Sequence, residues 1–327
     1  MASYFAAYMD WFLIGGGLLG LFLGGEALIR GAVAIAERLR LPKLLVGLTI
    51  VGFGTSMPEL LVSLKAVSKG AADVAVGNVI GSNIANILLI AGMGGLISPF
   101  IIRGNAVKRD ALVMTLSTAA LAGFAWQGGI DRQTGLAMTA ALCLYLIIVL
   151  ILDRNHSSAE VETSKPLPFL LAFIFVGVGL LSLVFGADSL VRGATSIATQ
   201  MGVSQAVIGL TLVAVGTSLP ELTVSVISAL RRQNEMALGN VIGSNIFNIL
   251  AVLGITAAIT PVHIDATFLQ VDTPVLLAAT AGLMLIVLLR PKLGRFAAFI
   301  GLAIYAAYMA WLALGPRLWQ LILDVAG

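Results

Sequence analysis

The sequence predicts an all-α membrane protein in which ten transmembrane helices form two inverted five-helix repeats. Three observations support this fold class. The chain has 327 residues, of which 59% are hydrophobic and 11% are charged, and its mean hydropathy is +1.03. Apolar runs of about 20 residues, long enough to cross a bilayer as helices, recur along it. A polar motif of two parts also appears twice, and its parts follow in the same order in both copies.

The predicted spans are helical because their apolarity is continuous, whereas a membrane barrel shows alternation within ten-residue segments. The N-terminus lacks the basic region and the small-residue cleavage site of a signal peptide, so we expect the first run to be a retained span. We place the ten spans at residues 11–34, 43–66, 73–97, 106–126, 133–152, 167–197, 204–230, 236–260, 269–289 and 295–315.

The basic residues predict the orientation of these spans. The loops that follow odd-numbered spans carry thirteen Lys and Arg residues, whereas the segments on the other side of the membrane carry four. This bias places the first set in the cytoplasm and both termini outside. We divide the chain into an N-terminal repeat at 1–152, a polar cytoplasmic linker at 153–166 and a C-terminal repeat at 167–327.

The duplicated motif predicts that the two halves have opposite orientations. Copies at 43–97 and 204–260 occupy the second and third spans of two successive blocks of five spans, and five is an odd number. The second block therefore enters the membrane upside down relative to the first. Inverted repeats are typical of secondary transporters, whose substrate site lies near the midplane of the bilayer.

The first part of each copy reads GTSMPEL at residues 54–60 and GTSLPEL at residues 216–222. Pro58 and Pro220 have no N–H group, and each ring clashes with the carbonyl group four residues earlier in a helix. We therefore expect helices 2 and 7 to break near the midplane. Irregular backbone at that depth is tolerated where it is buried in protein or lines a cavity.

The side chains of the motif are hard oxygen ligands. Ser56, Glu59 and Ser63 share one helix face, and the next span carries a polar stripe of Asn78, Ser82 and Asn86. The counterparts in the second half are Ser218, Glu221, Ser225, Asn240, Ser244 and Asn248. This set suits Na⁺ or Ca²⁺ rather than zinc or copper. Two facing glutamates repel each other, and bound cations would relieve that repulsion.

Some of these polar residues also have a structural interpretation. Asparagines in membrane helices form interhelical hydrogen bonds, and this alternative applies to Asn78, Asn83, Asn240 and Asn245. Opposite charges at i,i+4 spacing predict self-neutralising ion pairs in Glu26/Arg30 and Asp188/Arg192.

GTSMPE with GSNIAN, followed by GTSLPE with GSNIFN, resembles the two α-repeats of the Na⁺/Ca²⁺ exchanger family of the Ca²⁺/cation antiporter superfamily, in a prokaryotic form. The resemblance implies that Glu59 and Glu221 bind Ca²⁺ and share Na⁺. It implies backbone carbonyl ligands at Thr55, Thr217, Gly52 and Ala214, hydroxyl ligands at Ser56, Ser218, Ser82 and Ser244, and a cavity lining at Asn86 and Asn248. Potassium-dependent members carry Asp at a position related to Asn248, so the asparagine argues against K⁺ co-transport.

We therefore expect a secondary active transporter that exchanges Na⁺ for Ca²⁺ by alternating access at a shared midplane site. The alternative on the same fold is an H⁺-driven Ca²⁺/cation antiporter, and a cation channel is a further one. We expect no enzymatic activity, because Ser56 and Ser218 do not lie in a G-x-S-x-G elbow. The expected partners are the lipid bilayer of a prokaryotic inner or plasma membrane and the transported Na⁺ and Ca²⁺, with no cofactor, nucleic acid or obligate protein partner.

Overall fold

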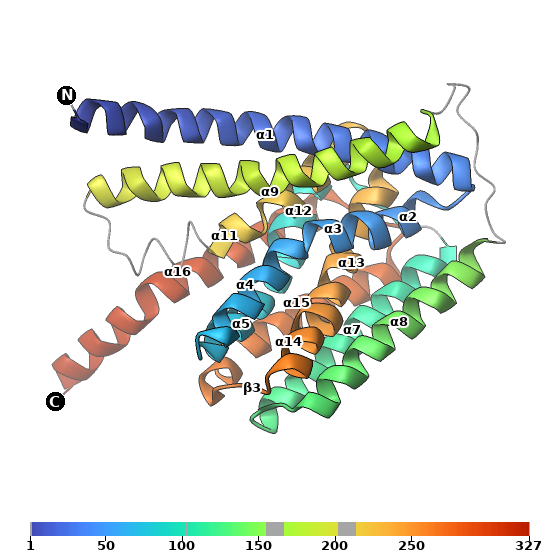
Figure 1. Cartoon of the computed structure of the whole chain (residues 1–327). Helices are drawn as coiled ribbons and strands as arrows, with labels where there is room; N and C mark the ends of the chain where they lie inside the picture. Colours follow the sequence, from blue (N-terminus) through green and yellow to red (C-terminus); the bar gives the residue numbers. More distant parts are fainter. Residues whose placement is uncertain (1, 103, 155–166, 202–213, 327) are drawn as a thin grey trace.

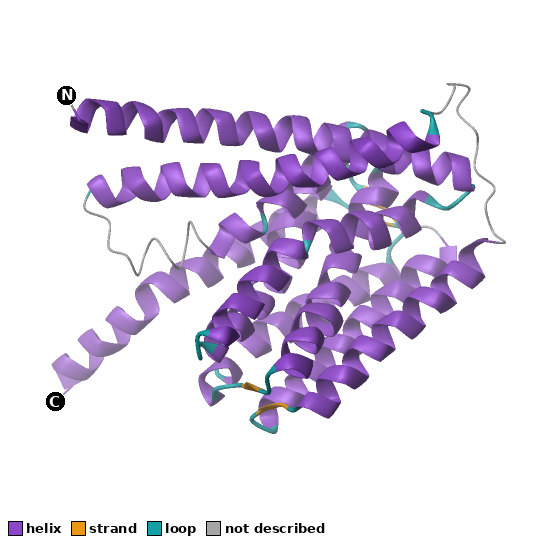
Figure 2. Cartoon of the chain, in the orientation of Figure 1, coloured by secondary structure: helices purple, strands orange, loops and turns teal. Residues whose placement is uncertain are grey.

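The computed structural model describes residues 2–102, 104–154, 167–201 and 214–326, and nearly all of them are helical (Figure 2). Most of the predicted linker (155–166, including His156) and the first part of the predicted seventh span (202–213) lie outside the described residues. The helices of the first half are α1 (Ala2–Leu39), α2 (Lys43–Val46), α3 (Gly52–Thr55), α4 (Met57–Ser68), α5 (Ala72–Ile84), α6 (Ala91–Ile97), α7 (Gly104–Trp126) and α8 (Arg132–Arg154). Those of the second half are α9 (Phe169–Gln200), α11 (Ala214–Thr217), α12 (Leu219–Leu230), α13 (Asn234–Phe247), α14 (Gly254–Ile259), α15 (Asp272–Leu289) and α16 (Arg295–Ala326).

Eight helical segments of the described chain are long and apolar enough to cross a membrane. They correspond to eight of the ten predicted spans, and the protein is a multi-pass, mostly helical membrane protein. The remaining two predictions fall on α7, a 23-residue helix, and on α12, a 12-residue apolar helix next to residues outside the description. The outermost helices extend beyond the predicted bounds: α1 begins nine residues before position 11.

Helices α1 and α9 form a closely packed pair along one side of the molecule (Figure 1). Glycines set their separation, because a Cβ atom added at Gly24 would lie 2.9 Å from the carbonyl oxygen of Gly179. On the opposite helix, a Cβ atom at Gly186 would lie 2.8 Å from the backbone nitrogen of Leu21. Small residues of this kind allow membrane helices to approach until their backbones touch.

The centre of the protein is formed by the helices that carry the second part of each motif. The spans differ in the share of residues that is buried within their 18-residue apolar stretches. This share is 83% in Asn234–Ile259 and 72% in Ala72–Ile97, but 33% or less in the spans of α1 and α9. Both central helices contain a π-helical turn, at Ala85–Ile90 and at Asn248–Leu253. Such turns are frequent at functional sites because the wider ring re-aims side chains.

Two short antiparallel ribbons join the halves of the chain. Strand β1 (Phe100–Ile101) pairs with β4 (Lys292–Leu293), and β2 (Gly129–Ile130) pairs with β3 (Val262–His263). Each ribbon therefore takes one strand from each half. The strands satisfy backbone groups of the loops that connect the central helices to the outer ones.

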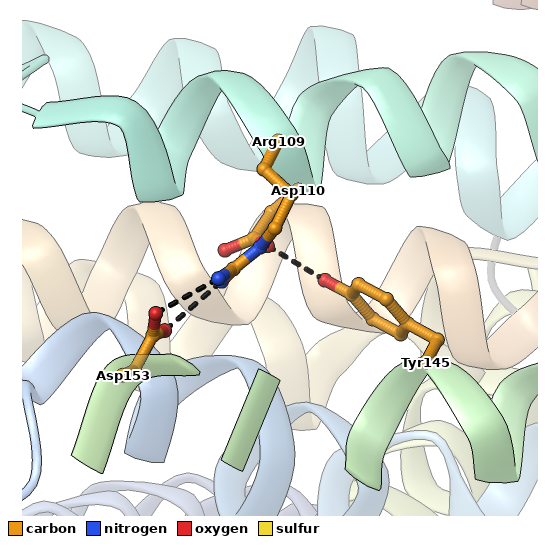
Figure 3. A network of polar contacts seen from close by, with 4 residues as sticks. All are labelled: Arg109, Asp110, Tyr145 and Asp153. Atoms are coloured by element: carbon orange, nitrogen blue, oxygen red, sulfur yellow. Dashed lines mark hydrogen bonds and ion pairs between the residues drawn. The ribbon is translucent and has the colours of Figure 1, made fainter. Parts of the chain in front are cut away.

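A buried ionic network connects α7 to α8 (Figure 3). The Arg109 guanidinium donates two hydrogen bonds to the Asp153 carboxylate, at 2.8 and 2.9 Å, and a third to Asp110 Oδ1 at 2.7 Å. Asp110 also accepts a hydrogen bond of 2.9 Å from the Tyr145 hydroxyl. Arg109 is one of the thirteen basic residues that predict the cytoplasmic side, and in the structure these two carboxylates neutralise its charge.

Candidate cation site

Each glutamate of the duplicated motif lies in the first turn of a helix that follows an interruption. Helix α3 ends at Thr55, Ser56 adopts φ −81° and ψ 2°, and α4 begins at Met57 with Pro58 in its first turn. Ser218 adopts φ −90° and ψ 6° between α11 and α12. A proline is tolerated at this position, since the first N–H groups of a helix have no intrahelical partner. The partial positive charge of the helix N-terminus favours a carboxylate in the first turn.

Hydroxyl groups link the two glutamates across the halves of the chain. Both carboxyl groups are buried, with Glu59 0% and Glu221 1% exposed. Ser56 donates to Glu221 Oε1 at 3.4 Å, which joins the first motif to the second. Ser82 donates to Glu59 Oε1 at 3.4 Å, and its oxygen lies 3.3 Å from the Ser218 hydroxyl.

One oxygen of each carboxyl group has no partner among the described residues. Glu59 Oε2 and Glu221 Oε2 are buried and accept no hydrogen bond from any described residue. A buried acceptor without a donor is costly, and an isolated buried charge is more costly still. These two oxygens therefore require a cation or a proton.

Asn78 and Asn240 hold the two glutamate-bearing helices in matching ways. The Asn78 side chain donates to the Glu59 carbonyl oxygen and to the Ser63 hydroxyl, both at 3.1 Å. Asn240 donates to the Glu221 carbonyl oxygen at 3.3 Å and to the Ser225 hydroxyl at 3.0 Å. The structural interpretation of these two asparagines, as interhelical hydrogen-bond donors, is thus confirmed.

Asn86 and Asn248 carry side-chain oxygens that remain available. Both are buried in π-helical turns, and neither oxygen accepts a hydrogen bond from a described residue. The Asn248 amide donates to Asn83 Oδ1 at 3.2 Å, across the halves. The counterpart of that contact, from the Asn86 amide to Asn245 Oδ1, does not form: neither atom has a described partner, and the Asn245 amide donates to the Val241 carbonyl oxygen of its own helix at 2.7 Å.

The other predicted site residues surround this centre. The Thr55 hydroxyl donates to Val51 and contacts Asn240 Oδ1 at 3.3 Å. The Gly52 carbonyl oxygen accepts the Ser56 N–H at 3.2 Å, and a Cβ atom at Gly52 would lie 3.2 Å from the Ser244 nitrogen. Ser244 is buried, and its hydroxyl contacts no described partner. Thr217 is half-buried at the end of α11, and Ala214 begins that helix.

Sequence reasoning missed one charged contact between the two halves of the chain. The ion pairs Glu26/Arg30 and Asp188/Arg192 are confirmed, the second at 2.8 Å. Glu26 also binds Arg231, which follows α12, at 2.6 Å.

A bundle of apolar helices whose centre holds two buried carboxylates among hydroxyl and amide oxygens defines a membrane transporter of hard cations. Within the described residues, no group of three or more His, Cys, Asp or Glu side chains could hold a metal ion, so a cation bound here must also use hydroxyl, amide or carbonyl oxygens. The chain belongs to the sodium/calcium exchanger protein family, whose sequence model matches residues 9–151 and 171–314. Members of this family are transporters and not enzymes.

Relatives support this membership over nearly the whole chain. The putative antiporter CaxA of Alkalimonas amylolytica is 37% identical, covering 90% of this chain and 95% of CaxA. The sodium/calcium exchanger MaX1 of Methanosarcina acetivorans is 30% identical, again covering 90% of this chain and 95% of the relative. The solved sodium-calcium exchanger NCX_Mj, soaked with Na⁺ and Sr²⁺, superposes with a TM-score of 0.82 at 32% identity, covering 93% of this chain and 98% of that one.

Proposed function

We propose that this protein exchanges Na⁺ for Ca²⁺ by alternating access, and that both ions compete for one site at the midplane of the membrane. The observation that carries the proposal is the pair of buried carboxyl groups, each with one oxygen bound to a serine and one without a protein partner. Ca²⁺ binds such oxygens, and Na⁺ ions bound in its place would neutralise the same charge. Mutually exclusive occupancy couples the two fluxes.

The proposed ligands are the residues gathered around these carboxyl groups. Glu59 and Glu221 bind Ca²⁺ and share Na⁺, while the remaining positions supply hydroxyl, amide or backbone oxygens. They are Thr55, Thr217, Ser56, Ser218, Ser82, Ser244, Asn86, Asn248, Gly52 and Ala214. The unpartnered oxygens of Asn86, Asn248 and Ser244 support this assignment. Gly52 and Thr55 lie beside the site but already form hydrogen bonds within the protein.

We also propose that the two halves, 1–152 and 167–327, are inverted repeats, with helices 2 and 7 broken at the midplane. The matching contacts of Asn78 and Asn240 support the repeat, as do the two cross-half ribbons. The turns at Ser56 and Ser218 support the breaks. The distribution of basic residues supports an orientation with both termini outside and the 153–166 linker in the cytoplasm. The bacterial and archaeal relatives support a prokaryotic plasma membrane location.

Reconstituted flux tests the function. In proteoliposomes loaded with Na⁺ and diluted into Na⁺-free medium containing Ca²⁺, the wild-type protein should accumulate Ca²⁺. Glu59→Gln and Glu221→Gln should each abolish accumulation, because the site loses one of its two charges. Glu235→Gln, which neutralises an exposed glutamate at the start of α13, is the matched control and should transport normally. Wild-type rates in both site variants would disprove the site.

H⁺-driven exchange is the second candidate, since the two unpartnered carboxyl oxygens also suit protons. Ca²⁺ uptake driven by a pH gradient and unaffected by Na⁺ would select it. Uptake without any counter-ion on the opposite side would instead indicate a channel. Asn248 supports exchange that does not depend on K⁺, and replacing K⁺ with choline at fixed Na⁺ should leave the rate unchanged.

A further inference from the structure

Helix α1 packs along α12, whereas the equivalent helices of the other half, α9 and α4, have no such extended contact. A Cβ atom added at Gly25 of α1 would lie 2.6 Å from Ile227 Cδ1 and 3.0 Å from Thr223 Cγ2. One helical turn beyond Ile227, Arg231 binds Glu26 of α1 through two nitrogens, at 2.6 and 3.2 Å. Contacts and an ion pair thus cover the face of α12 formed by Thr223, Ile227 and Arg231.

The corresponding face of α4 is uncovered. Its residues, 162 positions earlier, are Leu61, Lys65 and Lys69. Leu61 is 59% exposed and its counterpart Thr223 is half-buried, while Lys65 is exposed and its counterpart Ile227 is only 5% exposed. Helix α9 packs along α1 and touches α3, but it does not run along α4. Helix α1 therefore covers this face on α12, whereas α9 leaves the equivalent face on α4 exposed.

The acid that corresponds to Glu26 is also less enclosed. Asp188 of α9 pairs with Arg192 of its own helix, and its side chain is 49% exposed, against 15% for Glu26. Lys69 makes no ion pair with any described residue. Because Glu26 binds Arg30 and Arg231 together, Asp188 has the capacity to bind Arg192 and Lys69 together.

We propose that Glu26–Arg231 and Asp188–Lys69 are alternative ion pairs, each of which forms in one of the two access states. In the state seen here, α1 is held on α12 at the end expected to be cytoplasmic. In the opposite state α9 covers Leu61 and Lys65 on α4, Asp188 binds Lys69 at the outer end, and Glu26 releases Arg231. Inverted repeats that exchange their conformations produce such a swap. This inference rests on the proposed function, because it requires two access states.

Cysteine cross-linking tests the pair that is not formed here. Lys69→Cys and Asp188→Cys are introduced together with Cys143→Ser, which removes the single native cysteine. In proteoliposomes a disulfide between positions 69 and 188 should form under oxidation. Adding Arg231→Gln should accelerate its formation about two- to five-fold, the range expected on loss of one partly exposed ion pair. Arg232→Gln removes the same charge at the next residue and should leave the rate unchanged.

Flux measurements separate this inference from the proposed function. Lys69→Asp and Asp188→Lys should each lower the exchange rate, and the double charge reversal should restore it. If the wild-type protein exchanges Na⁺ for Ca²⁺ but no disulfide forms and the reversals have no effect, the alternative ion pairs are refuted and the exchanger stands. If the wild-type protein does not exchange the two ions at all, the proposed function itself fails.

Discussion

Replacing Arg109 should destabilise the fold more than any other single change in the α7–α8 interface. In Arg109→Leu the carboxylates of Asp110 and Asp153 lose their shared guanidinium while remaining 1% and 10% exposed. Breaking a buried ion pair by removing one partner costs about 3–5 kcal/mol, and the 23% exposure of Arg109 places this case near 3 kcal/mol. The variant therefore leaves two neighbouring buried charges uncompensated.

The unfolding entropy converts this cost into a melting shift. At about 2.1 cal/mol/K per residue, 327 residues give roughly 0.7 kcal/mol/K, so 3 kcal/mol lowers Tm by about 4 °C. The assay is thermal unfolding of the purified protein in detergent. Asp153→Asn is the matched comparison: it leaves Arg109 paired with Asp110, so its cost is about 1 kcal/mol. A Tm for Arg109→Leu within about 1 °C of wild type, or a larger loss in Asp153→Asn, would refute this reasoning.

Two further predictions concern the site and the α1–α9 pair. Ser82→Ala removes the hydroxyl between Glu59 and Ser218. It should raise the half-saturating Na⁺ concentration about 13-fold, since a hydrogen bond to a charged group contributes about 1.5 kcal/mol. Binding of ²²Na⁺ measures this change, and unchanged binding would exclude Ser82 as a ligand. Gly24→Val places a side chain against the Gly179 backbone, and should lower both Tm and the exchange rate. Gly15→Val, which meets nothing within 4 Å, is its control, and equal effects of the two changes would contradict the packing argument.

Much of the fold could be predicted because the signals are local. Continuous apolarity marks each span, Pro58 and Pro220 mark the turns beside Ser56 and Ser218, and i,i+4 spacing identifies the Glu26–Arg30 pair. The burial of both motif glutamates also follows from their place in apolar segments. These features depend on residues within a few positions of one another.

The contacts that sequence reasoning missed join residues far apart in the chain. Arg109 meets Asp153 across 44 positions and Glu26 meets Arg231 across 205, so neither pairing has a local pattern. The sequence also does not predict the different hydrogen bonds of Asn83 and Asn245, because the repeat predicts equal environments for both. Helix packing in one particular conformation makes them unequal.

The two ribbons have a consequence for the ancestry of the chain. Strand β1 corresponds to β3, and β2 corresponds to β4 with a shift of one residue, so each ribbon pairs the same two loops in exchanged roles. Two separate copies of one half, inserted in opposite directions, would therefore form both ribbons by two-fold symmetry. If the two halves are the inverted repeats proposed above, the ribbons correspond to the interface of an antiparallel homodimer of one half, and co-expressed halves should reassemble through them.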